Sequence, residues 1–590
     1  MTDVEGGLDE PTELEPEQGS LDLAGPDDAP SRSDWEREAA AVLRKARRMS
    51  EDDPDDLVWE KLTRSTLDGI AVTPLGTRAV LDELVTAGRP QRVGEWDIRA
   101  HLSVADATLD NEALLVDLQN GVTSLWLQLK DASTDLEALL SEVLLDLAPV
   151  VLDAPAEPVA AARALLDLLS ARGVAAAAGT NLGADPVRAT ADDLVAVARL
   201  ALQAGVLGAV VDATAVHDRG ASDAQELGYS LAVGAAYLRS LTDAGLDLTD
   251  ALRLVEFRYA ATDEQFPTIA KLRAARRLWA RVAEVCGAPV EARSQRQHVV
   301  TSRPMMSKYD PWVNMLRTTV ASFAAGVGGA DAVTVLPFDS ALGRPDAFGR
   351  RIARNTSSLL IAESHLAKVA DPAGGSYLVE KLTDDLARAG WEEFSRIEES
   401  GGVAAALADG SLQARIDEVA ALREEQIARR TRPLTGVSEF PHLGETLPER
   451  EPDDSASAVR RYGASFEALR DEPAATPVFL ATMGSIAAHT ARATFATNLF
   501  AAGGIAVTPA GATGGVADVL AAYDAQPVVC LAGPDAAYAE WGAELVAALR
   551  EAGARWVILA GKPGDLAVDD SCAIGVDALT FLTTTREKLA

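Results

Sequence analysis

The chain has 590 residues and a mass of 61.9 kDa, more than one ordinary hydrophobic core accommodates, so two or more domains are expected. Asp and Glu number 89 against 54 Lys and Arg, a formal charge of −35 that repels phosphate backbones and argues against a nucleic-acid partner. The three cysteines, Cys286, Cys530 and Cys572, lack CxxC spacing. They exclude a disulfide scaffold and a thiolate zinc site, and they favour a cytoplasmic location.

The N-terminal region predicts a tail followed by an arm. Residues 1–30 hold ten acidic residues and no basic one, which is typical of a disordered acidic tail and not of a signal peptide. No apolar stretch reaches the roughly 20 residues of a spanning helix, so no membrane partner is expected. Residues 31–120 are interpreted as an N-terminal arm and the lead-in to a barrel. The arm begins with an amphipathic helix at 35–47, whose expected apolar face is Trp35, Ala39, Val42, Leu43 and Ala46.

Residues 121–400 alternate short apolar runs with amphipathic helices. Repeated βα units of this kind predict a parallel sheet, and their number over this length favours a (β/α)8 TIM barrel. The expected strands include 124–129, 149–155, 174–180, 208–214, 252–260 and 332–338.

A helical linker is predicted at 401–475, where the composition shifts to charged and then to Pro-rich and Gly-rich sequence. Residues 476–590 return to βα alternation, which predicts an α/β, doubly wound domain of flavodoxin type. Its expected strands lie within 477–484, 505–515, 527–533, 556–564 and 578–585.

Few residues suggest chemistry by themselves. The six histidines form no HExxH, HxH or Cys/His cluster, so no metal site is expected. The first strand end of the C-terminal domain reads Met483-Gly484-Ser485-Ile486-Ala487-Ala488, without charge, imidazole or thiol. By its residues alone, this domain is interpreted as a packing unit.

Several longer motifs carry a family resemblance. The segments LRAARRLWARV (272–282), RIARNTSSLL (351–360) and DPAGGSYLVEKLTDDLA (371–387) resemble the methylmalonyl-CoA mutases. These are adenosylcobalamin-dependent isomerases that interconvert methylmalonyl-CoA and succinyl-CoA. The resemblance covers roughly residues 90–590 and implies that the C-terminal domain is of the cobalamin-binding type.

The resemblance also locates departures from the family pattern. The DxHxxG loop, whose His binds cobalt, has Met483, Ser485 and Ala488 at its three defining positions. A hydroxyl is a poor cobalt ligand, and the carboxylate that would orient an imidazole is missing. No cofactor is therefore expected on this chain, and adenosylcobalamin is expected on a partner chain.

Positions in the barrel depart from the pattern as well. Gly329 aligns with the His of a QGH motif, His101 with the Tyr of RQYAG, and His217 falls in the segment resembling GYHIQEAG. The resemblance thus implies the small, non-catalytic (beta) chain of the heterodimeric bacterial enzyme, with no catalytic residues of its own. Its partner would be the large catalytic chain, which carries the acyl-CoA substrate. Whether this chain also contacts the family's GTPase chaperone stays open.

Two alternatives remain at this stage. One is an autonomous acyl-CoA-processing enzyme that does not use cobalamin, with candidate residues His217, Asp218, Arg293 and Arg317, although no motif pairs a base with an orienting group. The other is an acyl-CoA-binding or scaffold protein that acts alone.

Overall fold

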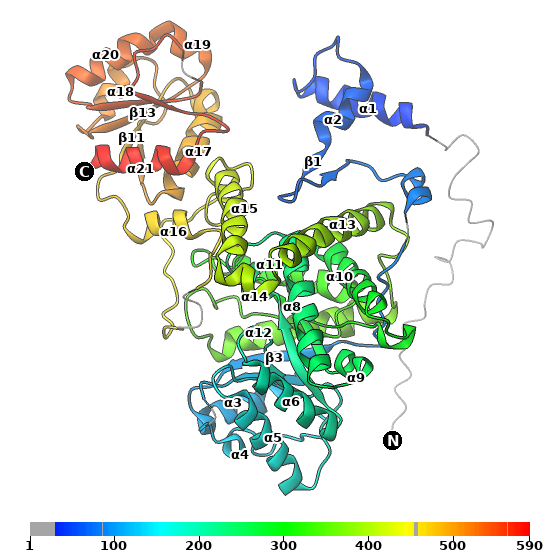
Figure 1. Cartoon of the computed structure of the whole chain (residues 1–590). Coiled ribbons are helices and arrows are strands. Elements are labelled where there is room, and N and C mark those ends of the chain that lie inside the picture. Colours follow the sequence, from blue (N-terminus) through cyan, green and yellow to red (C-terminus); the bar gives the residue numbers. More distant parts are fainter. Residues whose placement is uncertain (1–29, 85, 132, 454–457, 563) are drawn as a thin grey trace, which may run out of the picture. The chain divides into compact units, whose positions relative to one another are not determined.

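A computed structural model describes residues 30–84, 86–131, 133–453, 458–562 and 564–590, which form two compact units (Figure 1). The described part of the first unit comprises residues 30–66 and 71–76. The second comprises residues 67–70 and the described residues from Thr77 to Ala590. The predicted acidic tail at residues 1–30 lies almost wholly outside the described residues.

The first unit has a small core of its own. Helix α1 (Arg32–Lys45) begins at a capping box in which the hydroxyl of Ser31 accepts from the N–H of Asp34. It packs against α2 (Val58–Leu62), with the rings of Trp35 and Trp59 centred 4.7 Å apart, and a short hairpin follows, β1 (Arg64–Ser65) with β2 (Ala71–Val72). The helix was predicted, but its expected apolar face was partly wrong, because Val42 is exposed and Ala40 is buried.

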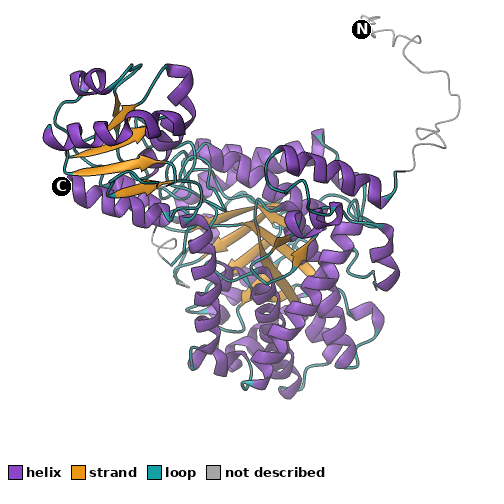
Figure 2. Ribbon diagram, turned by 90° about the horizontal axis from the view of Figure 1, so that it is seen from above, coloured by secondary structure: helices purple, strands orange, loops and turns teal. Residues whose placement is uncertain are grey.

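The second unit contains a closed barrel of eight parallel strands surrounded by helices (Figure 2), which confirms the predicted TIM-barrel class. The strands are β3 (Asp97–Ser103), β4 (Ser124–Gln128), β5 (Val150–Asp153), β6 (Asn181–Ala184), β7 (Leu207–Asp212), β8 (Val255–Ala261), β9 (Arg296–Thr301) and β10 (Ala332–Thr334). The first strand lies before residue 121, so the barrel begins earlier than the predicted boundary.

Besides β3, two strands differ from the sequence-based expectation. The run of alanines at 174–180 precedes β6 as a loop, because alanine side chains are too small to pack a strand. The expected strands did not include β9, whose pattern is interrupted by Gln297 and His298, both of which are buried.

Helices follow the barrel strands and return the chain to the amino end of the sheet. The main ones are α3 (Ala107–Gln119), α5 (Pro158–Arg172), α6 (Ala191–Ala204), α8 (Asp223–Asp243), α10 (Gln265–Val285), α11 (Val313–Val327) and α12 (Ala347–Ser358). The helices begin and end at residues that commonly cap helices. Thr190 caps the start of α6, and Gly205 ends it in the left-handed conformation at φ +69°.

A helical segment connects the barrel to the C-terminal domain. It contains α14 (Val403–Ala408), α15 (Ser411–Ala428) and α16 (Ala464–Asp471), and it follows α13 (Tyr377–Glu399), which packs against α8 and α10 of the barrel. Arg423 on α15 donates to the carbonyl oxygens of Gly220 and Ala221 at 2.8 and 3.1 Å, so α15 is fixed to the loop after β7.

The C-terminal domain is a five-stranded parallel sheet in the order β12-β11-β13-β14-β15. Its strands are β11 (Val478–Thr482), β12 (Val507–Pro509), β13 (Val528–Ala532), β14 (Trp556–Ala560) and β15 (Asp570–Cys572), and its main helices are α17 (Ile486–Ala502), α18 (Val516–Ala522), α20 (Ala543–Glu551) and α21 (Ala578–Leu589). This order confirms the predicted doubly wound fold.

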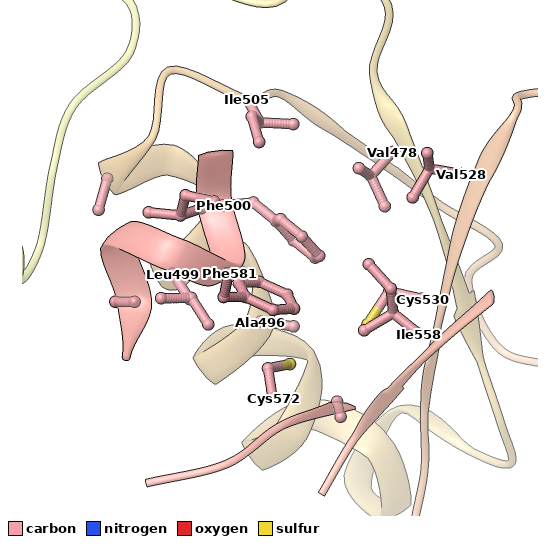
Figure 3. Close-up of a cluster of buried hydrophobic side chains, with 14 of the residues drawn as sticks. Val478, Ala496, Leu499, Phe500, Ile505, Val528, Cys530, Ile558, Cys572 and Phe581 are labelled. Atoms are coloured by element: carbon pink, nitrogen blue, oxygen red, sulfur yellow. The ribbon is translucent and has the colours of Figure 1, made fainter. Parts of the chain in front are cut away.

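Segment 578–585, expected to be the last strand, is instead part of helix α21. Its apolar residues Ala578, Phe581, Leu582 and Leu589 recur at helical spacing, and Asp577 caps its first turn. Phe581 packs 5.6 Å from Phe500, centroid to centroid, in the core on one face of the sheet (Figure 3). The edge strand is β15, three residues long and too short for the apolar pattern to reveal.

Within the described part of the chain, no helix combines the length and apolar character that crossing a bilayer demands.

Replacing Phe500 by Ala should lower the opening free energy of the C-terminal domain by about 3–5 kcal/mol, because the site is fully buried and a cavity would remain. Hydrogen exchange of the β11 and β13 amides in the full chain measures this domain separately. Ile574→Ala, at a side chain that is 95% exposed, should leave the same amides unchanged. Equal protection in both variants would show that this cluster does not stabilise the sheet.

Candidate functional site

The interior of the barrel contains a buried ion pair near the amino ends of the strands. Arg99 on β3 and Glu256 on β8 both have fully buried side chains, and Arg99 Nη1 lies 2.7 Å from Glu256 Oε2. Arg99 Nε also donates to the hydroxyl of Ser124 at 3.0 Å. Burial would raise the pKa of Glu256, yet the attraction of Arg99 and Arg296 outweighs it and holds that pKa below its ordinary value.

A second layer fills the axis above this pair. Arg258 on β8 donates to Asp212 at 2.8 Å and to His298 Nδ1 at 3.1 Å, and its guanidinium lies 3.7 Å from the ring centroid of Trp126. His298 Nε2 lies 2.8 Å from the hydroxyl of Thr334. Since Nδ1 accepts from Arg258, Nε2 carries the proton and donates to Thr334. The axis is therefore closed by paired polar and aromatic side chains.

His101, one of the predicted positions, lies in this layer. Its ring is centred 4.1 Å from Trp126, and its Nε2 is buried without a hydrogen-bond partner among the described residues. Burial, with Arg303 and Arg258 nearby, lowers the pKa of His101 to about 3. His101 is thus neutral at physiological pH and cannot serve there as a general acid.

His217, on the short helix α7 (Thr214–His217), stands between a hydroxyl and a carboxylate. Its Nε2 is 2.7 Å from Ser302 Oγ, and its Nδ1 is 3.5 Å from Glu226 Oε2. Glu226 also accepts from Lys271 Nζ at 2.6 Å. This is the order of groups found in Ser-His-acid triads, and sequence reasoning missed it because 85 residues separate Ser302 from His217. Ser302, however, is only 1% exposed.

The other predicted candidates are dispersed. Asp218 pairs with Arg303 at 3.2 Å beside His217. Arg293 lies just before β9, at the amino end of the sheet, and pairs with Glu284 at 3.1 Å. Arg317 donates to the Thr435 carbonyl oxygen at 2.7 Å and fixes the linker. The structure therefore brings His217 and Asp218 together but leaves Arg293 and Arg317 in structural contacts.

Gly329 lies in the turn between α11 and β10, at the amino end of the sheet, whereas substrates of TIM barrels bind at the carboxyl ends. It has φ +87°, and a Cβ there would lie 2.4 Å from Pro90. Only glycine fits this backbone. The location does not support the expectation that Gly329 replaces a substrate-contacting His.

In the C-terminal domain, the loop after β11 offers little to a metal ion or a corrin. Met483 is fully buried, and its side chain belongs to the core beneath the loop. Ser485 and Ala488 are exposed, and the Ser485 hydroxyl does not cap α17. The nearest imidazole is His489, one turn into α17 and buried, with Nδ1 3.2 Å from the Gly484 carbonyl oxygen.

The gap between β11 and β12 at this strand end is closed by two threonines. Thr482 donates to the Gly511 carbonyl at 2.6 Å, and Thr513 donates to the Thr482 carbonyl at 2.7 Å. No group of three or more His, Cys, Asp or Glu side chains in the described ranges could hold a metal ion. The residues at this loop do not fit cobalamin bound through an imidazole–cobalt bond, because they supply neither the ligand nor its carboxylate partner.

Sequence reasoning did not identify the side chains that fill the barrel axis. One signal was present: charged Glu256 and Arg258 alternate within an otherwise apolar strand, and alternate strand residues face the same side. Their partners on β3, β7 and β9 could not be assigned without the register of the barrel.

Comparison with known proteins identifies a family and several relatives of this chain. The methylmalonyl-CoA mutase family model matches residues 207–524. The chain is 47% identical to the methylmalonyl-CoA mutase small subunit of Streptomyces virginiae, covering 97% of this chain and 99% of that one. It is 43% identical to a probable small subunit of Mycobacterium bovis (90% and 94% covered) and 36% identical to that of Propionibacterium freudenreichii subsp. shermanii (97% and 96%).

Replacing Glu256 by Leu should destabilise the barrel by about 3–5 kcal/mol, because Arg99 would remain buried without its main partner. The double variant Arg99→Met/Glu256→Leu should recover most of that loss. Urea unfolding measures the free energy of unfolding of both variants. Because the folded pKa of Glu256 is lowered, the wild-type pair contributes above the ordinary Glu pKa of about 4.3 and is lost as the pH falls through the folded value. A double variant as unstable as the single one would contradict this account.

Proposed function

The chain belongs to the methylmalonyl-CoA mutase family, and from that premise we propose that it is the small, non-catalytic subunit of a heterodimeric mutase. In this proposal the large subunit binds adenosylcobalamin and the acyl-CoA substrate and carries out the isomerisation. The present chain supports the large subunit by association and contributes no catalytic residue.

The observation that carries the proposal is the filled barrel axis. A barrel that acts on a bound substrate needs space where its strands end. Here Trp126, Arg258 and His298 occupy the interior with 2% exposure or less, and each is held by its neighbours. Moving Arg258 aside would leave Asp212 without this ion pair, at a cost of several kcal/mol.

The C-terminal domain supports the same conclusion independently. Its Met483 side chain is part of the core, and its Ser485 hydroxyl is the group that stands where a cobalt ligand is expected. The cofactor of the family is therefore proposed to be held by the partner alone. We further propose a cytoplasmic location, in agreement with the three free cysteines, and a GTPase chaperone as a partner of the assembled enzyme.

One observation favours a second function, an autonomous acyl-transfer enzyme that uses Ser302 as the nucleophile, His217 as the base and Glu226 as the orienting carboxylate. Burial argues against it, since Ser302 and Glu226 are almost completely inaccessible to a substrate.

A fluorophosphonate that labels activated serines should therefore leave Ser302 unmodified in the native chain. Mass spectrometry of the labelled peptides measures this, with His217→Gln as the control that removes the base. Stoichiometric labelling of wild type that disappears in His217→Gln would favour the acyl-transfer enzyme and would refute a purely supporting role.

Cobalt content tests the main proposal. The chain alone, mixed with adenosylcobalamin and gel-filtered, should retain no corrin absorption, and the complex reconstituted with its large subunit should contain one cobalt per pair. Ser485→His should still bind no cobalt when alone, because Met483 supplies no carboxylate. Two cobalts per pair, or corrin retained at molar stoichiometry by the isolated chain, would require this assignment to be abandoned.

A further inference from the structure

A cavity of about 480 Å³ opens into the barrel wall between β3 and β10. The ladder between these strands stops after Ala332↔Asp97 and Val333↔Ile98, although β3 continues to Ser103. The cavity is lined along β3 from Ile98 to Ser103 and along the segment that begins at Thr334. Its volume lies in the range of small-molecule sites.

The inner part of this cavity is apolar. Met306, Leu336 and Val122 line it and are 5% exposed or less, and Ala353 on α12 is also buried there. An apolar floor of this kind favours a ligand with a compact hydrophobic body over a fully hydrated ion.

One wall of the cavity is formed by guanidinium groups that outnumber the carboxylates paired with them. Arg354 Nη1 lies 2.7 Å from Asp117 Oδ1, and Arg350 Nε lies 3.8 Å from Asp117 Oδ2, so one carboxylate serves two cations. Arg344 donates to the Ser103 carbonyl oxygen at 2.9 Å and forms no salt bridge with a described residue. Arg344, Arg350 and Arg354 thus exceed their carboxylate partner by two positive charges.

Polar atoms at this wall are also left without partners. The Nε atoms of Arg350 and Arg354 are buried and make no hydrogen bond within the described ranges, and Arg354 is more than nine-tenths buried. His101 also lines the cavity, and its Nε2 likewise makes no hydrogen bond with a described residue. Buried donors without acceptors are costly, so a bound acceptor would be favourable here.

No other acidic side chain in the described lining of the cavity forms a salt bridge with Arg344, Arg350 or Arg354. Asp346 is paired with Arg450 at 2.8 Å, and Asp110 accepts from the N–H groups of Ala105 and Asp106 at 2.7 and 3.0 Å. Glu449 and Glu451 are exposed to solvent, where their charge is screened.

We propose that this cavity binds a small organic oxyanion, a carboxylate or a phosphate monoester with a compact apolar body, through Arg344, Arg350 and Arg354. Planar guanidinium groups suit both oxyanions, because they donate two parallel hydrogen bonds. The proposal goes beyond the supporting role above and does not depend on it, since every residue that it uses belongs to this chain.

Calorimetric titration of the full chain with phenyl phosphate and with phenylacetate tests the proposal. At least one probe should bind one site per chain, and the tighter of the two identifies the preferred oxyanion. Arg344→Gln and Arg350→Gln should each weaken that binding about 10-fold or more, because each removes a charged hydrogen bond. Ala353→Leu, which keeps every charge but fills the apolar floor, should abolish it.

The matched control is Arg351→Gln. Arg351 lies on the same helix as Arg350, is exposed and faces Phe348 outside the cavity, so this variant should bind as wild type does. A urea unfolding curve for each variant separates lost binding from lost folding. If neither probe binds, or if Arg351→Gln weakens binding as much as Arg350→Gln, the proposal is overturned. These outcomes are independent of cobalt content and of the large subunit.

Discussion

The pairing of buried arginines with carboxylates along the barrel axis is the constraint on which the rest of the barrel depends. Arg99 with Glu256 and Arg258 with Asp212 hold charges in a region with almost no water. Such charges persist only when each is paired and hydrogen-bonded, and removing one partner costs more than the pair gains. The axis is therefore fixed by electrostatics as well as by packing, and a substrate could enter only by breaking these pairs.

Packing determines the fold separately from the residues at the strand ends. Strand patterns, helix caps and the sheet order of both domains are intact, because packing determines them. The residues at the carboxyl ends can change without disturbing that packing. In the C-terminal domain, Met483 belongs to the core, and Thr482 and Thr513 join the neighbouring strand ends.

The two regions at the carboxyl ends differ in what they could still do. The axis is filled by side chains whose charges are paired, whereas the wall between β3 and β10 retains a cavity with guanidinium groups that share one carboxylate. The filled axis stabilises the chain, and the wall between β3 and β10 is suited to binding an anion. Buried donors without an acceptor occur in both regions, at Arg258 Nη2 on the axis and at Arg354 Nε on the wall, so the open space beside the wall is what marks the difference.

The sequence by itself determined the fold class and the doubly wound C-terminal domain, because periodicity and turn residues are local properties. Segment 578–585 was misassigned because its β-branched threonines favour a strand, while packing of Phe581 on Phe500 selects a helix. Only the tertiary structure decided which charges meet along the axis, that Ser302 lies beside His217, and that Gly329 lies far from the carboxyl ends. Those contacts join residues distant in sequence, and they depend on the register and closure of the barrel, which no local pattern encodes.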